Sequence, residues 1–164
     1  MTAVAENRPR SRTILVVTAL CLAAFGYGVF VLFTPDRFPM NFARGPVARP
    51  APDLIVGPYP VEAELLRLKR MGVVEVLSLL DAASPVEGEL VVRERNLVER
   101  LGMRFVNIPV PVGALLAGDG GWEARTAGHI RANPVSLRYL HCYLGRHRVK
   151  RVLDALNLPE NPAG

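Results

Sequence analysis

The sequence is poor in cysteine, lysine and aromatic residues. Its 164 residues include two cysteines and two lysines, and 7% of them are aromatic. Two cysteines, Cys21 and Cys142, cannot build the disulfide framework of a small secreted domain. Scattered aromatics argue against nucleic-acid binding, which uses exposed aromatics interleaved with basic residues. Because lysine is scarce, the net charge of +5 rests on 18 arginines. Such a balance suits phosphate or carboxylate partners, or reflects a biased genome.

One stretch, residues 13–33, has neither a charge nor a proline over 21 positions. At about 1.5 Å per residue, a helix of this length crosses a hydrocarbon core of roughly 30 Å. The tail before it, residues 1–12, carries Arg8, Arg10 and Arg12. A cleaved signal peptide is the alternative, but the apolar run is longer than usual and no small-x-small cleavage site follows it. We therefore predict a single-pass membrane anchor.

The segment after the anchor, residues 34–52, contains five prolines and no periodic apolar pattern, which predicts an extended linker. Arginines on both sides of the anchor leave the positive-inside count tied. Because a short basic N-terminal tail usually stays inside, we expect the folded domain, residues 53–164, to lie outside the cytoplasm.

Apolar periodicity in this domain alternates between strand-like and helix-like segments. Short β-branched runs predict strands, amphipathic runs ending at glycine predict helices, and a Gly-rich loop covers residues 111–121. Strand–helix alternation indicates an α/β fold with a largely parallel central sheet flanked by helices. The expected strands are 53–57, 73–80, 105–108 and 136–142, and the expected helices are 61–71, 89–101, 122–132 and 148–156.

The last expected strand leads into His141-Cys142-x-x-Gly145-x-x-Arg148. A loop of this length between a strand and a helix can turn successive backbone N–H groups toward one centre, where the helix N-terminus also favours an anion. The same field favours the thiolate of Cys142, and the planar fork of Arg148 can bind two phosphate oxygens. The expected phosphate-binding loop comprises Tyr143, Leu144, Gly145, Arg146, His147 and Arg148.

The motif resembles the active-site loop of cysteine-dependent protein phosphatases of the dual-specificity type. The resemblance extends over about residues 53–156 and includes Ile55-Val-Gly-Pro-Tyr-Pro60, the strand 72–80 and residues 101–109. It implies that Cys142 is a nucleophile forming a phosphocysteine intermediate and that Arg148 binds the phosphoryl group. It also implies that His141 holds the loop and tunes the thiolate, with no cofactor or metal required.

The resemblance further implies a general acid on an earlier loop. Asp119 is the carboxylate between the expected strand 105–108 and the helix that starts at Trp122, so we expect it to be the acid, with Glu123 and Asp81 as substitutes. Val149 departs from the family pattern, which has a hydroxyl residue after the loop arginine. The chain also ends eight residues after Leu156, so we expect a partner or a homo-oligomer contact to buttress the loop.

Other readings of the same residues carry less weight. Zinc binding is disfavoured, because adjacent His141 and Cys142 point to opposite faces of a strand and the domain offers no second cysteine. A basic surround of the loop would steer anionic substrates toward Cys142; it would consist of Arg138, Arg146, Lys150 and Arg151. The apolar run 13–33 and the resemblance together predict a membrane-anchored phosphatase that acts on phosphotyrosine, and on phosphoserine or phosphothreonine, in protein substrates. The alternative is a catalytically weak or inactive phosphate-binding module.

Overall fold

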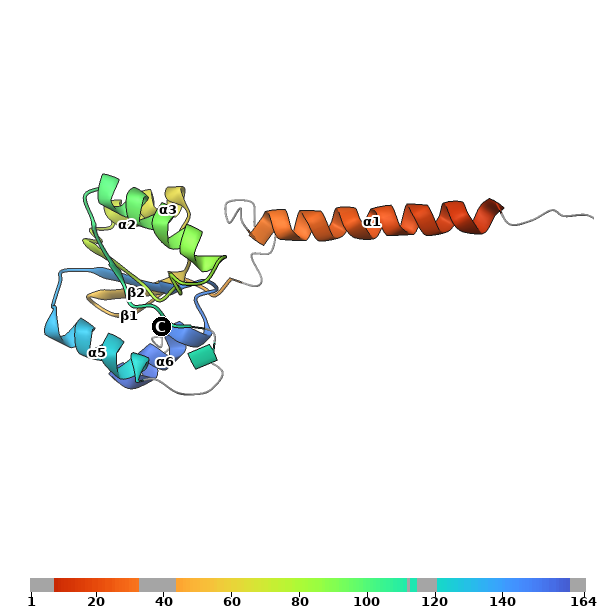
Figure 1. Cartoon of the computed structure of the whole chain (residues 1–164). Helices are drawn as coiled ribbons and strands as arrows, with labels where there is room; N and C mark the ends of the chain where they lie inside the picture. The colour runs from red at the N-terminus through yellow and green to blue at the C-terminus, as the bar shows by residue number, and fades with distance from the viewer. Residues whose placement is uncertain (1–7, 33–43, 112, 115–120, 160–164) are drawn as a thin grey trace, which may run out of the picture. The chain divides into compact units, whose positions relative to one another are not determined.

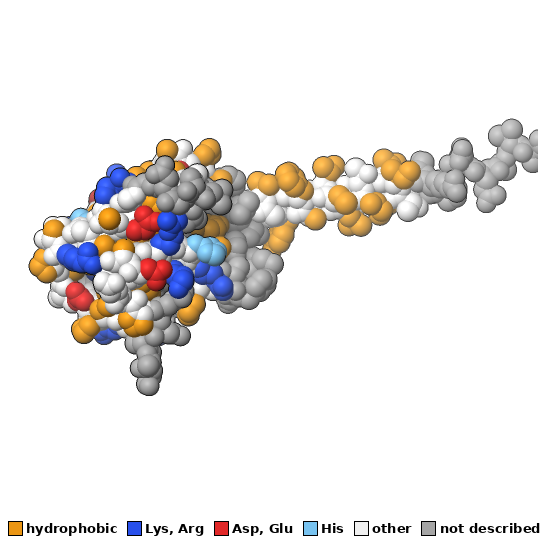
Figure 2. Space-filling view, turned by 90° about the horizontal axis from the view of Figure 1, so that it is seen from below, with side chains coloured by type: hydrophobic (Ala, Val, Ile, Leu, Met, Phe, Trp, Pro, Cys, Tyr) orange, Lys and Arg blue, Asp and Glu red, His pale blue; other side chains and the backbone are white. Residues whose placement is uncertain are grey.

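The computed structural model describes residues 8–32, 44–111, 113–114 and 121–159, with no side-chain description for 8–12 and 31–32. The chain divides into two compact units, Met1–Pro39 and Met40–Gly164. Helix α1 (Arg8–Leu32) belongs to the first unit. Its segment Thr13–Phe30 is long and apolar enough to cross a membrane, a test that a signal sequence also passes. Figure 2 shows apolar side chains exposed along it. Leu22 and Phe25 are both exposed large apolar residues of this helix.

The second unit is built on a five-stranded sheet in the order β1-β2-β5-β3-β4. Strand β1 pairs antiparallel with β2, and the other neighbours pair in parallel. The strands are β1 (Ala48–Ala51), β2 (Leu54–Pro58), β3 (Glu75–Ser78), β4 (Arg104–Asn107) and β5 (Arg138–Cys142). Strand β5 is the central strand of the sheet. The loop that follows it therefore begins in the middle of the row of strand ends.

Helices cover both faces of the sheet (Figure 1). Helices α2 (Glu62–Arg70) and α3 (Glu87–Arg100) lie on one face, and α5 (Trp122–Ala132) and α6 (His147–Leu156) lie on the other. Two of the apolar clusters lie on opposite faces of the sheet, because successive strand side chains point to opposite faces. On β5, Tyr139 packs toward α2 and α3, whereas Leu140 and Cys142 pack toward α5 and α6. The sequence-based prediction of an α/β fold with a mostly parallel sheet is therefore confirmed.

The N-terminal edge of the sheet differs from the prediction. Strand β1 lies inside the range 34–52, which the sequence predicts to be a linker. Ala48 pairs with Val56, and Ala51 pairs with Leu54, so these residues are part of the sheet. Sequence periodicity misses β1 because its four residues, Ala-Arg-Pro-Ala, show no β-branched or alternating pattern. Pairing with β2 produces the strand.

Candidate functional site

The motif cysteine lies at the C-terminal end of the central strand. Cys142 is the last residue of β5, and the chain then turns through residues 143–146 into α6. Its side chain is 4% exposed and packs in the cluster between the sheet and helices α5 and α6. In sheets with parallel strands, ligands bind beyond the carboxyl ends of the strands, which is where the loop stands.

A cavity of about 180 Å³ opens at this loop. Cys142 and Arg148 both line it, so the structure brings together the predicted nucleophile and the predicted phosphate-binding arginine. Glu87, the first residue of α3, also lines it, and no pattern in the sequence predicts this. The remaining lining residues are Tyr143, Leu144 and His147.

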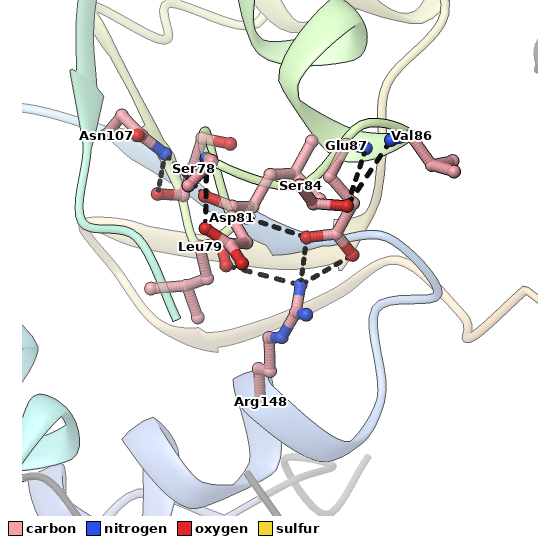
Figure 3. A network of polar contacts seen from close by, with 10 residues as sticks. Ser78, Leu79, Asp81, Ser84, Val86, Glu87, Asn107 and Arg148 are labelled. Atoms are coloured by element: carbon pink, nitrogen blue, oxygen red, sulfur yellow. Dashed lines mark hydrogen bonds and ion pairs between the residues drawn. The ribbon is translucent and has the colours of Figure 1, made fainter. Parts of the chain in front are cut away.

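Glu87 orients the arginine. Arg148 Nη1 lies 2.9 Å from both carboxylate oxygens of Glu87 and 3.3 Å from the carbonyl oxygen of Leu79. Figure 3 shows these contacts as dashed lines. The Glu87 carboxylate also accepts a 2.6 Å hydrogen bond from the backbone N–H of Asp81. Ser84 Oγ accepts from the Glu87 amide at 3.3 Å. Glu87 thus holds the Arg148 guanidinium in the cavity that Cys142 lines. A bound anion would compete with the Glu87 carboxylate for this guanidinium.

Two carbonyl groups of the loop accept hydrogen bonds from neighbouring segments of the chain. Tyr143 O accepts from Tyr59 N at 3.2 Å, and Leu144 O accepts from Gly45 N at 2.6 Å. In a planar trans peptide, the C=O of one residue and the N–H of the next point in opposite directions. The N–H groups of Leu144 and Gly145 therefore point away from these two supports.

Gly145 is the one position of this turn that demands glycine. Its φ of 68° lies in the left-handed region, and a Cβ there would overlap the backbone of Gly57 and Pro58 in β2. The glycine that the motif requires is therefore needed both for the turn and for close packing of the loop on the neighbouring strand.

His141 lies on the other side of β5 from the cavity, within the protein core. It is fully buried, and its Nε2 lies 2.7 Å from a carboxylate oxygen of Glu94, which is equally buried on α3. The imidazole stacks on Tyr139, with ring centroids 5.6 Å apart, and meets the edge of Tyr59 at 6.1 Å. Its backbone carbonyl accepts from Leu79 N at 2.9 Å. His141 thus ties the end of β5 to α3 through a buried acid–base pair.

The candidate acids fall into two groups. Asp119 lies outside the described residues. The substitutes are described: Asp81 Oδ1 accepts from Ala83 N at 3.0 Å, and Glu123 forms an ion pair with Arg151. Neither substitute lines the cavity, so among the described residues the carboxylate there belongs to Glu87.

The predicted basic surround needs one correction. Arg138 begins β5, at the opposite end of the strand from Cys142. It is 1% exposed and pairs with buried Glu75, which also pairs with Arg104. Arg138 therefore neutralises a buried carboxylate and does not steer substrates. On the face of the protein that Figure 2 shows, basic and acidic side chains are interspersed.

Two further properties bear on the chemistry of the cavity. Burial, and secondarily the nearby Glu87 carboxylate, raise the pKa of the Tyr143 phenol, so the cavity wall stays uncharged there at neutral pH. Across the described ranges, no group of three or more His, Cys, Asp or Glu side chains is arranged to hold a metal ion.

No protein-family model matches the sequence, and no curated protein matches it. Among solved structures, two crystal structures named "Putative phosphatase (DUF442)" from Shewanella putrefaciens CN-32 superpose with a TM-score of 0.56 and 21% sequence identity. Each alignment covers 66% of this chain, and 68% or 66% of the other. Pseudomonas aeruginosa TpbA aligns with a TM-score of 0.38 and 17% identity over 60% of this chain and 54% of its own. At these identities the likeness to the DUF442 structures establishes the fold alone.

Proposed function

We propose that the second unit is a cysteine-dependent phosphatase that hydrolyses phosphoric monoesters on proteins through a phosphocysteine intermediate. The observation that carries the proposal is that Cys142 and Arg148 line one cavity beyond the carboxyl end of the central parallel strand. Such chemistry uses a nucleophile, a cationic side chain that binds the phosphate, N–H groups that point toward it and a helix N-terminus. The fold is also shared with the two crystal structures named "Putative phosphatase (DUF442)".

In the proposed first step, the phosphate group enters the cavity and displaces the Glu87 carboxylate from part of its contact with Arg148. The Arg148 guanidinium then binds two phosphoryl oxygens, while the N–H groups of Leu144 and Gly145 bind a third. The Cys142 thiolate attacks phosphorus, a sulfur–phosphorus bond forms, and the bond to the leaving oxygen breaks. We assign the proton that this oxygen takes up to Asp119.

In the second step, water attacks the phosphocysteine, and Asp119 takes a proton from it. The sulfur–phosphorus bond breaks, which releases inorganic phosphate and restores the Cys142 thiolate. The chain's own groups supply every proton transfer in this scheme.

The cavity walls favour an aromatic phosphoester. Tyr143 and Leu144 form an uncharged side of the cavity, against which a substrate ring can pack. We therefore assign phosphotyrosine as the first substrate class, with phosphoserine and phosphothreonine as smaller groups that gain less contact. The ratio of kcat/KM for matched phosphotyrosine and phosphoserine peptides tests this assignment.

A non-catalytic phosphate-binding module is the second candidate, and Val149 favours it. This residue follows the loop arginine and is 3% exposed in the apolar cluster under the loop, so it offers no hydroxyl to assist departure of the thiolate. A slow second step would leave the protein as a binder of phosphorylated ligands. Comparing binding with turnover separates the two candidates.

The decisive experiment measures hydrolysis of a small aryl phosphate by the full-length protein. Cys142→Ser should abolish turnover, whereas Cys21→Ser, which changes the other cysteine of the chain, should leave it unchanged. Phosphate or vanadate binding without turnover would select the binding module. Absence of both would refute a phosphate site.

We also propose that α1 anchors the protein in a membrane as an uncleaved helix. The uncharged length of Thr13–Phe30 supports this proposal. Alkaline carbonate extraction, followed by N-terminal sequencing of the membrane fraction, tests it. A mature protein that begins after residue 33 would show instead that the helix is a signal sequence.

A further inference from the structure

We propose that residues 44–48, called the strap below, are a positioning element for the loop 143–146, with Arg44 and Gly45 as positioning residues. The strap lies outside the sequence motif and precedes it by about a hundred positions. The proposal rests on the phosphate-binding role of the loop and assigns to the strap the rigidity that this role requires.

The first contact is a backbone hydrogen bond. Gly45 N donates to Leu144 O at 2.6 Å. This bond holds the carbonyl of the Leu144–Gly145 peptide outward, and the planar peptide then directs the Gly145 N–H the opposite way. Without the bond, the peptide can rotate and exchange its N–H for its carbonyl oxygen. A carbonyl oxygen facing a phosphate repels it, so the orientation of this single peptide alters anion affinity directly.

The second observation is steric. A Cβ on Gly45 would lie 2.6 Å from Gly145 O and 3.1 Å from Leu144 O, and both neighbours are backbone atoms of the loop. Neither can move aside as the end of a flexible side chain could. Gly145 in turn packs directly on the Gly57–Pro58 backbone. The loop is therefore held between two layers of backbone, with the strap outside and β2 inside, and Gly45 is the residue that permits the outer layer.

The third observation is the anchoring of the strap itself. Arg44 Nη2 donates to Tyr59 O and to Glu64 Oε2, both at 2.8 Å. Tyr59 also donates its N–H to Tyr143 O in the loop. One guanidinium therefore fixes the strap to the start of α2 and to the residue that holds the adjacent loop carbonyl. Hydrogen bonds from a charged donor are about twice as strong as neutral ones, which suits an anchoring role.

The strap also borders a second cavity. A cavity of about 140 Å³ lies beside the strap, lined by Pro46 and Ala48 from the strap and by Gly145, Arg146 and Val149 from the loop and α6. The hydrogen bonds of Arg44 and Gly45 therefore hold the strap beside an open space. Changes at these two residues should reach the phosphate site without disturbing the main core.

The test compares Gly45→Ala and Arg44→Met with Gly128→Ala in the full-length protein in detergent. Gly128 lies in α5 with nothing within 4 Å of an added Cβ, so it controls for the substitution itself. The probe is inorganic phosphate, and the readout is its protection of Cys142 against alkylation by iodoacetamide, followed by mass spectrometry. Alkylation of each variant in the absence of phosphate serves as the reference for the reagent. This readout needs no turnover.

We expect the phosphate concentration for half-protection to rise about tenfold in both variants, the size of one weakened hydrogen bond. In Gly45→Ala the added Cβ pushes the strap away from Leu144 O, and in Arg44→Met the strap loses its bonds to Tyr59 and Glu64. Gly128→Ala should match the wild type, and Arg44→Lys, which keeps a cation beside Glu64, should recover most of the affinity. For aryl phosphate hydrolysis, KM should rise by a larger factor than kcat falls. A merely structural role would lower the melting temperature and leave half-protection unchanged.

Wild-type protection in both Gly45→Ala and Arg44→Met would overturn the strap proposal and leave the phosphate site intact. If Gly45→Ala does not fold, Arg44→Met decides the question alone. A wild-type protein that phosphate fails to protect would instead overturn the phosphate site, and the strap proposal with it. The two failures are therefore distinguishable.

Discussion

Replacing Glu94 by leucine should strongly destabilise the second unit. Glu94 and His141 are both fully buried, His141 Nε2 lies 2.7 Å from a carboxylate oxygen of Glu94, and their side-chain polar atoms make no hydrogen bond with any other described residue. Removing one member leaves the other polar group in the core without compensation. Breaking a buried pair in this way costs about 3–5 kcal/mol, a large share of a typical stability of roughly 5–15 kcal/mol.

Urea unfolding followed by tryptophan fluorescence measures this loss. Trp122 is the one tryptophan in the sequence and is 1% exposed, so its emission reports on the second unit. With a urea m-value of about 1.5 kcal/mol/M, a loss of about 3 kcal/mol lowers the midpoint by about 2 M.

A double-mutant cycle separates the pair from the general cost of substitution. Glu94→Leu with His141→Leu removes both polar groups, so the double variant should be destabilised by clearly less than the sum of the two single variants. Additive single effects, or a loss below about 1 kcal/mol in Glu94→Leu, would refute the pairing.

Three further changes have defined outcomes. Arg148→Lys should lower kcat/KM for an aryl phosphate by about 10²-fold, because an ammonium group cannot bind two phosphoryl oxygens as the planar fork does; activity close to the wild type would contradict the clamp. Gly145→Ala should cost more than about 2 kcal/mol in urea unfolding, since its φ of 68° and the backbone below it leave no room for a methyl group. The pKa of Tyr139 is well above its usual 10.0, chiefly through burial. The neutral phenol therefore contributes stability below pH 10 that is lost as the pH rises further, and Tyr139→Phe should flatten this alkaline loss in urea titrations.

The sequence predicts most of the fold because the signals for helices and strands are local. The predicted helix 122–132 coincides with α5, and the buried strand before the motif coincides in its last residue with β5. Strand β1 is missed for the opposite reason, because Ala48–Ala51 becomes a strand only by pairing with β2. Propensity and periodicity carry no information on such a contact.

The candidate site divides in the same way. Cys142, Gly145 and Arg148 lie within seven consecutive residues, so one motif is enough to place them together. Glu87 precedes Arg148 by 61 residues and sits at the start of an ordinary amphipathic helix. Glu94 lies four residues after Leu90 and four before Val98, on the apolar side of the same helix, and it is buried against His141. An acidic residue on the apolar side of a predicted helix is the one signal that could have indicated it.

Arg138 illustrates the limit of charge counting. Its position four residues before Cys142 suggests a basic surround, but strand geometry places it at the far end of β5, beside Glu75. A charged residue close to a motif in the sequence can therefore be far from it in space. Its position along the strand or helix decides whether its charge acts on the motif.

The central claim is that Cys142 becomes covalently phosphorylated during turnover. Rapid acid quenching of the full-length protein with an aryl phosphate, followed by peptide mass spectrometry, tests it directly. We predict a phosphate group on the peptide that contains Cys142, absent from Cys142→Ser and from protein without substrate, and formed at least as fast as steady-state turnover. Hydrolysis that proceeds with an unmodified Cys142, or with phosphate on another residue, would contradict the account.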